Sequence, residues 1–338
     1  MGGQVLNRPE DLPIIFGRLD ENIIAIEKAF DVSVTNRDGR LIISSKDGKN
    51  IEKAQDVLEK LVKMAESGQE IDIMTVNYLI ASVDDGSLLQ AAKVAGGNGN
   101  AVVITCTGKP IKPKTVGQEK YIELIDKNTV IFGVGPAGTG KTYLAMAAAI
   151  AAFKRGDVAR IILSRPAIEA GEKLGFLPGD LQQKVDPYLR PLYDALFEIM
   201  GPEAFARNTE KGLIEVAPLA YMRGRTLDNS FIILDEAQNT TPAQMKMFLT
   251  RIGFGSKAIV TGDITQTDLA DGAKSGLKDA LNIIKGIDGI GISMLTNKDV
   301  VRHPLVQKII GAYEKAENKA KSSHVTIKRG KVYEKKEK

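Results

Sequence analysis

The chain has 338 residues, enough for two domains and a tail, with 43% hydrophobic residues, 26% charged residues and a formal net charge of +4. Its single cysteine, Cys106, excludes an internal disulfide framework and clustered-cysteine zinc sites, and fits a reducing compartment. No apolar run is long enough to span a bilayer and the start lacks signal-peptide order, so we expect a cytoplasmic protein without membrane contact.

The N-terminal part predicts a small α+β module. The expected elements are a short strand at 12–16, a turn at 17–20, an amphipathic helix at 21–30, a hairpin of strands at 32–35 and 41–44, and a long helix from residue 50. This βαββα order resembles the KH-type RNA-binding domain, which clamps nucleic-acid backbone with a GxxG loop. The corresponding loop reads Gly17-Arg18-Leu19-Asp20, so its second glycine is missing. Core packing alone would give the same pattern, and both interpretations stay open.

Helical periodicity continues over 71–94, is broken by glycines at 96–99, and gives way to a basic linker at 109–114. We therefore expect a domain boundary there. The predicted divisions are a KH-like α+β module with a helical extension at 1–108, a linker with a Gln-containing motif at 109–120, an α/β domain at 121–314 and a basic tail at 315–338. The tail holds nine Lys or Arg against three Glu, so it either binds RNA phosphates or only improves solubility.

Apolar runs beyond the linker alternate with helical segments, as buried parallel strands do. They lie at 130–134, 161–163, 231–234, 258–260 and 290–295. This alternation predicts a doubly wound α/β domain with a parallel sheet. A long insert at 168–217, with a structured loop at 171–179 and a helix at 185–200, is expected to bind RNA or a partner.

A phosphate-binding loop follows the first of these runs and precedes an alanine-rich helix. Its glycines allow backbone N–H groups to face a polyphosphate at the helix N-terminus, which is a strong nucleotide signal in this context. Lys141 can reach the β- and γ-phosphates, and the Thr142 hydroxyl can ligate Mg²⁺. The expected phosphate-binding residues are Gly135, Pro136, Ala137, Gly138, Thr139, Gly140, Lys141 and Thr142.

Two carboxylates, Asp235 and Glu236, end the strand at 231–234, at the edge of a parallel sheet where ligands collect. Asp235 suits a Mg²⁺ site, and Glu236 is positioned to polarise the water that attacks the γ-phosphate. We expect the pair on a core strand neighbouring the strand of the phosphate loop. Together these features predict an ATPase.

Two glutamines complete the expected site. Gln266 follows the strand at 258–260 in the run Gly262-Asp263-Ile264-Thr265-Gln266, where it could sense the γ-phosphate. Gln118 precedes the first strand of the α/β domain, and its amide could pair with both edges of adenine. That pairing would select ATP over GTP.

These motifs, in this order, resemble the PhoH-like family, whose ATPase domain is related to superfamily 1 helicases. The similarity covers roughly 114–313 and includes Gln118, the phosphate loop, Ser164-Arg165-Pro166-Ala167, Asp235-Glu236-Ala237-Gln238 and the run ending at Gln266. The resemblance implies a RecA-like fold, ATP and Mg²⁺ as cofactors, and work on RNA beside an RNA-processing endoribonuclease in ribosomal RNA maturation. The N-terminal module also looks like the one this family carries.

After residue 295 the sequence leaves room for one or two helices and a tail, so we do not expect the second RecA-like domain that supplies an arginine finger in true helicases. Hydrolysis is therefore slow, or another subunit of a homo-oligomeric ring, expected to be a hexamer, completes the site. Arg302 is the candidate finger in trans, and a local surface role for it stays open. Beside it, His303 is expected to pack locally. Further candidates for nucleic-acid or intersubunit contact are Arg165, Arg223, Arg225 and Arg251.

Two rival functions remain. One is a nucleotide-dependent switch or scaffold that binds ATP, hydrolyses little of it and presents a partner-binding surface. The other is a small-molecule kinase, which is disfavoured because Glu236 beside Asp235 points to attack by water. The sequence therefore favours a cytoplasmic Mg²⁺-dependent ATPase acting on RNA.

Overall fold

The computed structural model describes residues 2–5, 8–37, 39–46, 48–96, 100–166, 181–269, 272–302, 305–306, 309–310 and 312–313, with backbone alone for 2–5, 9 and 181–188. Residues 1–300 form one compact unit and residues from 301 onward belong to a second, whose described part beyond Arg302 is helical. The predicted tail at 315–338, the loop at 171–179 and His303 lie outside the described residues. Within the described part, none of the helices combines the length and hydropathy that bilayer crossing requires.

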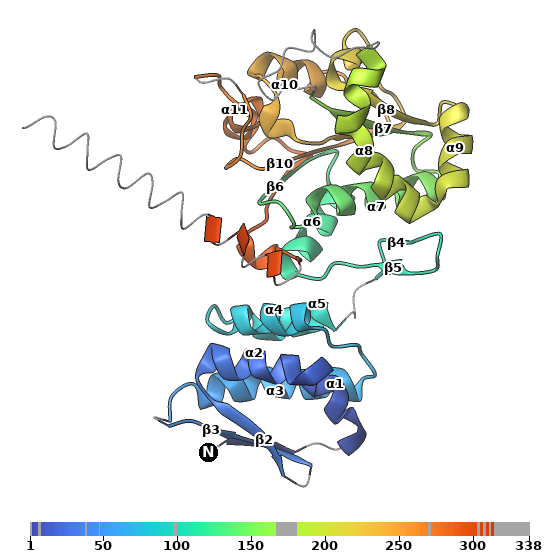
Figure 1. The fold of residues 1–338 in the computed structure, drawn as a ribbon. Coiled ribbons are helices and arrows are strands. Elements are labelled where there is room, and N and C mark those ends of the chain that lie inside the picture. Colours follow the sequence, from blue (N-terminus) through green and yellow to red (C-terminus); the bar gives the residue numbers. More distant parts are fainter. Residues whose placement is uncertain are drawn as a thin grey trace, which may run out of the picture. The chain divides into compact units, whose positions relative to one another are not determined.

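The N-terminal module is a three-stranded antiparallel sheet covered by helices (Figure 1). Its elements are β1 (Gly2–Val5), α1 (Leu12–Phe16), α2 (Glu21–Phe30), β2 (Ser33–Arg37), β3 (Arg40–Ser44), α3 (Ile51–Glu66), α4 (Ile73–Val83) and α5 (Leu88–Ala95). The predicted helices and hairpin are confirmed. The strand expected at 12–16 is wrong, because these residues form α1, which has Pro13 in its first turn. With β1 added, the order is βααββα, and β3 lies between β1 and β2.

The loop between α1 and α2 has a tightly constrained backbone. Gly17, Leu19 and Asp20 all have left-handed φ angles, at 76°, 54° and 58°. A Cβ at Gly17 would lie 2.6 Å from the Asn22 side chain, which is buried and donates to the Ile15 carbonyl at 3.2 Å. The loop is therefore a fixed turn that leaves the Leu19 side chain exposed.

The larger sheet has six strands in the order β11-β6-β10-β9-β7-β8, and all neighbours are parallel. The strands are β6 (Val130–Val134), β7 (Arg160–Arg165), β8 (Ile214–Pro218), β9 (Ser230–Leu234), β10 (Lys257–Gly262) and β11 (Ile290–Met294). The predicted parallel α/β sheet is confirmed, although β8 was missed. The segment expected to be an insert, 168–217, contains α8 (Leu181–Met200), α9 (Pro202–Glu210) and most of β8. The connection between β7 and β8 is therefore shorter than the expected insert.

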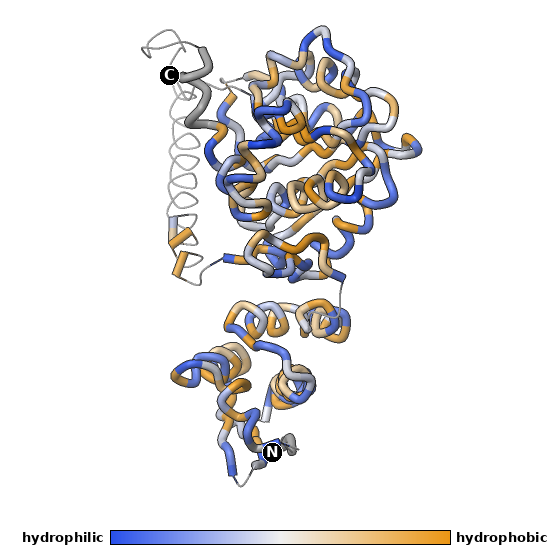
Figure 2. The backbone as a smooth tube through the Cα atoms, turned by 90° about the vertical axis from the view of Figure 1, so that its right-hand side faces the viewer, coloured by the Kyte–Doolittle hydropathy of each residue, from blue (hydrophilic) through white to orange (hydrophobic). Residues whose placement is uncertain are grey.

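Helices cover both faces of the sheet, which makes the fold doubly wound (Figure 1). They include α6 (Val116–Lys127), α7 (Lys141–Arg155), α10 (Pro242–Leu249) and α11 (Gly276–Ile283), and the ribbon β4 (Val103–Ile104) and β5 (Pro110–Ile111) lies beside α7. Alternate strand residues enter opposite cores: Ile131 packs with α6 and α7, and Phe132 packs with α10 and α11. Figure 2 shows hydrophobic segments in the interior of this domain and mostly hydrophilic segments around them.

Candidate functional site

Glycines shape the turn between β6 and α7. Gly138 and Gly140 have φ angles of 88° and 75°, a region that side chains with a Cβ rarely enter. Gly135 is needed for a different reason, because a Cβ there would lie 2.7 Å from Leu295 at the end of β11. The turn therefore keeps its backbone close to the sheet and opens directly onto the N-terminus of α7, where unpaired N–H groups and the helix dipole favour an anion.

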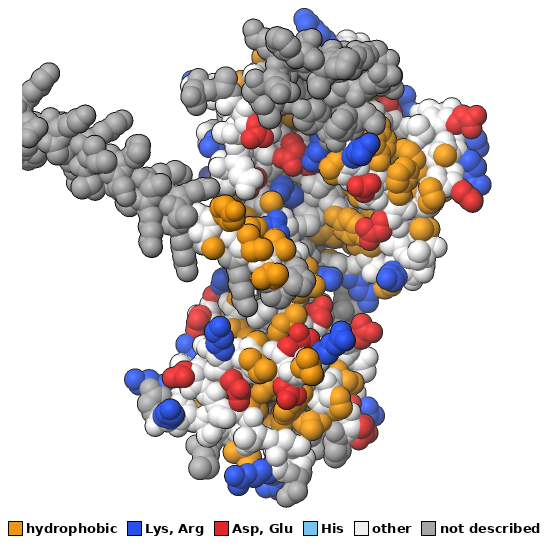
Figure 3. Space-filling model, viewed as in Figure 1, with side chains coloured by type: hydrophobic (Ala, Val, Ile, Leu, Met, Phe, Trp, Pro, Cys, Tyr) orange, Lys and Arg blue, Asp and Glu red, His pale blue; other side chains and the backbone are white. Residues whose placement is uncertain are grey.

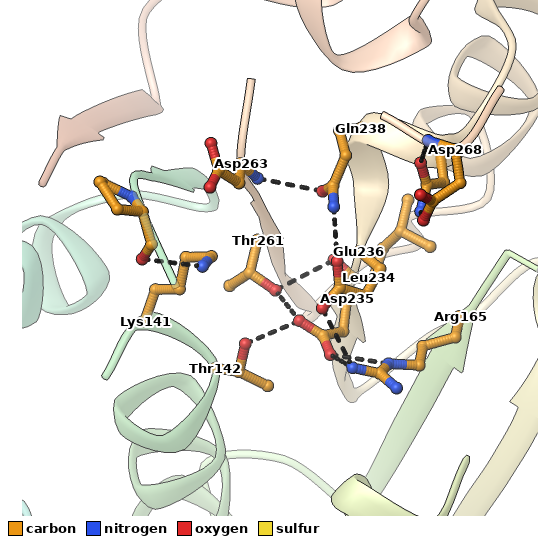
Figure 4. A network of polar contacts seen from close by, with 12 residues as sticks. Lys141, Thr142, Arg165, Leu234, Asp235, Glu236, Gln238, Thr261, Asp263 and Asp268 are labelled. Carbon is orange, nitrogen blue, oxygen red and sulfur yellow. Dashed lines mark hydrogen bonds and ion pairs between the residues drawn. The ribbon is translucent and has the colours of Figure 1, made fainter. Parts of the chain in front are cut away.

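Lys141 and Thr142 begin α7 and face the ends of the strands (Figure 4). The Lys141 ammonium donates to the Pro136 carbonyl oxygen of its own loop at 3.3 Å. The Thr142 hydroxyl donates to Asp235 Oδ1 at 2.7 Å, although the two residues are 93 positions apart. The fold thus brings the phosphate loop and the first acidic residue into direct contact.

Asp235 and Glu236 follow the last residue of β9. Asp235 is only 1% exposed, and its Oδ1 also accepts a hydrogen bond from the Thr261 hydroxyl at 2.7 Å. Glu236 has a left-handed φ of 54° and its side chain is 44% exposed. The expectation that the pair lies on a strand adjacent to β6 is wrong, because β10 lies between β6 and β9. Strand β10 contributes Thr261, whose hydroxyl connects β10 to Asp235 at the end of β9.

Arg165, the last residue of β7, contacts both carboxylates. Its Nε and Nη2 donate to Asp235 Oδ2 at 2.8 and 2.7 Å, and Nη2 donates to Glu236 Oε1 at 3.2 Å. Sequence reasoning placed Arg165 among residues for nucleic-acid or intersubunit contact. The structure instead places its guanidinium within the acidic pair (Figure 4).

The Gln238 side chain joins Glu236 to the end of β10, a link the sequence did not predict. Its Nε2 donates to Glu236 Oε2 and its Oε1 accepts from the Asp263 backbone N–H at 3.0 Å. Gly262 makes this approach possible, since a Cβ there would lie 2.7 Å from Gln238 Oε1. Asp263 Oδ2 is buried and has no hydrogen-bond partner among the described residues. A ligand donor would find an acceptor there.

The Gln118 side chain is buried against the phosphate loop. Its Nε2 donates to the Thr139 carbonyl at 3.1 Å, and its Oε1 accepts from the Lys114 N–H at 2.7 Å. Both polar ends therefore bind protein backbone. Gln266 is exposed, and its described contact is a backbone bond to the Asp263 carbonyl at 3.3 Å. Arg302 is half-buried and belongs to the second unit.

The remaining candidate arginines differ in their contacts. Arg225 makes a two-pronged pair with Glu215 at 2.6 and 2.7 Å, and this partner raises its pKa. Arg251 donates to the backbone carbonyls of Met247 and Arg225 at 3.2 and 3.1 Å. Arg223 is exposed. Two of the three therefore stabilise the fold around α10, and Arg223 lies on the surface.

Tyr121 of α6 lies beneath the site. It is fully buried, and its hydroxyl has no hydrogen-bond partner among the described residues. Burial is the main cause that raises its pKa, with a smaller contribution from the negative charge of Asp235. A Cβ at Gly133 would lie 2.6 Å from this hydroxyl, so the glycine leaves room for the ring.

The donor set fits a hard divalent cation. The Thr142 hydroxyl and the Asp235 carboxylate are oxygen ligands, which Mg²⁺ prefers. The Thr142 hydroxyl oxygen and Asp235 Oδ1 lie 2.7 Å apart, close enough to bind the same ion. Asp235 Oδ2 is held by Arg165. These residues therefore suit Mg²⁺ accompanying a bound nucleotide, provided that the guanidinium gives up its contact.

The sequence relatives of this chain share one family description. Residues 110–314 match the family model described as PhoH-like protein. A PhoH-like protein of Bacillus subtilis is 50% identical over 312 residues, covering 92% of this chain and 97% of the relative. A PhoH-like protein of Mycobacterium bovis is 50% identical over 310 residues, covering 91% of this chain and 87% of the relative. Among solved structures, a Sulfolobus solfataricus SWI2/SNF2 ATPase core in complex with dsDNA aligns with 43% of this chain and 31% of its own, at 16% identity and a TM-score of 0.30.

Proposed function

The chain belongs to the PhoH-like protein family, and we propose that it is a Mg²⁺-dependent ATPase that acts on RNA. The observation that carries this proposal is the convergence of Lys141, Thr142, Asp235 and Glu236 at one edge of the parallel sheet. A glycine turn at a helix N-terminus binds phosphates, and a carboxylate beside it can activate water.

The proposed roles follow from the contacts. The loop N–H groups and the Lys141 ammonium hold the phosphates, while Thr142 and Asp235 hold Mg²⁺, which neutralises phosphate charge when bound. Glu236 accepts a proton from the attacking water, for which its partly exposed carboxylate is better suited than the buried Asp235. Gln238 keeps Glu236 oriented.

Two variants test hydrolysis. Lys141→Ala removes the phosphate-binding ammonium and is expected to abolish nucleotide turnover. Glu236→Gln keeps the shape of the side chain but cannot accept the proton, so it is expected to retain bound ATP with little hydrolysis. Turnover by Glu236→Gln at the parent rate would refute the role of Glu236, and nucleotide binding measured by calorimetry controls for folding.

RNA binding is proposed from features outside the sheet domain. In the N-terminal module a fixed turn joins two helices, in the place of the GxxG loop of the KH-type domain it resembles. Arg37 and Arg40, both exposed, lie opposite each other near the tip of the β2–β3 hairpin. On the face shown in Figure 3, positive and negative side chains are interspersed, so we expect modest affinity that falls with salt. RNA affinity that does not change between low and high salt would contradict this.

Completion of the site by a second copy is a further part of the proposal. We propose a homo-oligomeric ring, expected to be a hexamer, in which Arg302 of one subunit serves the site of the next. Mixing Arg302→Ala subunits with Lys141→Ala subunits tests this, because a finger in trans lets the mixture regain activity. Family resemblance supports an RNA-processing endoribonuclease as partner, with ribosomal RNA maturation as the setting.

The alternative function is a switch or scaffold that binds ATP with little turnover. The specific observation in its favour is Arg165, which occupies both carboxylates that hydrolysis needs. ATPase rates with and without single-stranded RNA separate the two. Stimulation by RNA favours the RNA-dependent enzyme, because a scaffold has no reason to respond.

A further inference from the structure

The pairing of strands β7 and β9 fixes Arg165 beside the acidic pair. Ser164 lies opposite Leu234 in this pair, and the Asp235 N–H donates to the Ser164 carbonyl at 2.9 Å. The next residue of each strand end is therefore Arg165 on one side and Asp235 on the other. A guanidinium at this position reaches both carboxylates from a rigid backbone, without needing a flexible loop.

Asp235 and Lys141 both have hydrogen-bond partners within the site. Asp235 Oδ1 accepts from Thr142 and Thr261, and its Oδ2 accepts from Arg165. Lys141 binds a carbonyl of its own loop. Each of these contacts involves Asp235 or Lys141, which a Mg²⁺-bound nucleotide would also contact, so binding has to rearrange them.

Charge makes the contact of Arg165 the most consequential of these. Asp235 is 1% exposed and the Arg165 side chain only 16%, so neither charge is well solvated and the ion pair between them compensates the buried charge of Asp235. A divalent cation at Asp235 and a guanidinium on the same carboxylate repel each other. The two cations therefore compete for one acidic pair.

We propose that Arg165 is a built-in counter-cation for Asp235 and Glu236 and competes with Mg²⁺ for them. This inference deepens the proposed function and rests on it. Release of Arg165 frees Asp235 for the metal and Glu236 for the attacking water in the same event. The strength of this contact thus sets how much Mg²⁺ the protein requires.

The test measures how the affinity for a fluorescent ADP analogue depends on Mg²⁺ in the parent and in Arg165→Gln. The variant lacks the competitor, so its half-saturating Mg²⁺ concentration is expected to fall about tenfold. Without Mg²⁺, in EDTA, its affinity is expected to be lower than the parent's, because the uncompensated carboxylates repel the phosphates. This crossing of the two curves distinguishes competition from a general loss of structure.

Matched measurements make each outcome decisive. Arg223→Gln removes an exposed arginine and is expected to behave as the parent. Arg165→Lys keeps the charge but loses the two-pronged contact, so its half-saturating Mg²⁺ concentration is expected to lie between those of the parent and Arg165→Gln. If Arg165→Gln does not fold, the comparison of Arg165→Lys with the parent tests the proposal. A half-saturating Mg²⁺ concentration that is unchanged or higher in both Arg165 variants overturns the proposal.

A metal-only measurement separates this inference from the proposed function. MgCl₂ without nucleotide is expected to raise the melting temperature of Arg165→Gln more than that of the parent, and an equal shift counts against competition. If the parent fails to bind the ADP analogue at any Mg²⁺ concentration, the proposed nucleotide function fails, and the melting measurement still judges the role of Arg165.

Discussion

Gln238 offers the sharpest test of how the site is held. Its amide donates to Glu236 Oε2 and accepts from the Asp263 N–H at 3.0 Å, so it fixes the proposed water-activating carboxylate against the end of β10. Gln238→Ala removes both bonds. Glu236 then keeps its contact with Arg165 and loses the one on its other oxygen.

The magnitude follows from the kind of bond lost. A hydrogen bond to a charged group contributes about 1.5 to 3 kcal/mol. If that contribution orients Glu236 in the transition state, kcat is expected to fall about 10- to 150-fold, at about 1.4 kcal/mol for each factor of ten. KM for ATP is expected to change little, because Gln238 does not touch the phosphate loop. The buried Asp263 N–H, left without its acceptor, lowers the free energy of unfolding by about 1 to 3 kcal/mol.

Asn239→Ala is the matched control. Asn239 is the next residue, and its side-chain amide also joins the end of β9 to the segment after β10, through Asp268 at 3.1 and 2.9 Å. Its contact with Glu236 is a backbone bond from the Asn239 N–H to the Glu236 carbonyl at 3.0 Å, which the substitution keeps. Its loss is expected to cost similar stability and to leave kcat nearly unchanged. Steady-state ATPase assays and urea unfolding of both variants give the comparison. Parent-like kcat in Gln238→Ala, or an equal loss in both variants, refutes the reasoning.

Four further predictions concern the surroundings of the site. Gln118→Ala removes the partners of two backbone groups, so affinity for ATP and GTP is expected to fall about equally, whereas a loss confined to ATP would show that Gln118 reads adenine. Gly133→Ala forces a Cβ against both the hydroxyl and the ring of Tyr121 and is expected to cost about 1 to 3 kcal/mol of stability, as urea unfolding would reveal; parent-like stability would contradict this clash. The pKa of Tyr121 in the folded protein is raised above 10.0, so the stability that Tyr121 contributes is complete below that pH and is lost as the pH rises toward the folded pKa. Tyr121→Phe is expected to reduce this alkaline loss of stability in pH-dependent melting. An unchanged melting profile would count against this prediction. Arg225→Ala breaks a half-exposed ion pair with Glu215 and is expected to lower stability by at most about 1 kcal/mol while leaving ATPase activity intact; a large loss of activity would be the contrary result.

Local sequence signals predicted elements well where they were long or had distinctive ends. The amphipathic period places α2 at Glu21–Phe30 within the predicted bounds, and continuous apolar runs locate β6 and β9. Short or edge segments were harder. Leu12–Phe16 is too short for its period to separate helix from strand, and Pro13 was the available signal for a helix start. In the edge strand β8, Glu215 interrupts the apolar residues, and Glu215 and Val216 are only half-buried. The strand therefore shows no continuous apolar run in the sequence.

The sequence by itself determined the chemistry that the protein carries: a glycine turn with Lys141 and Thr142 at a helix start, and two carboxylates ending an apolar strand. These features are local, because they depend on backbone conformations and side chains within a few residues of one another. Only the tertiary structure decided that β10 separates β6 from β9, that Arg165 holds the acidic pair and that Gln238 supports Glu236. Strand order and register join residues such as Thr142 and Asp235 across 93 positions, and they result from the packing of whole strands and helices, which no single segment specifies.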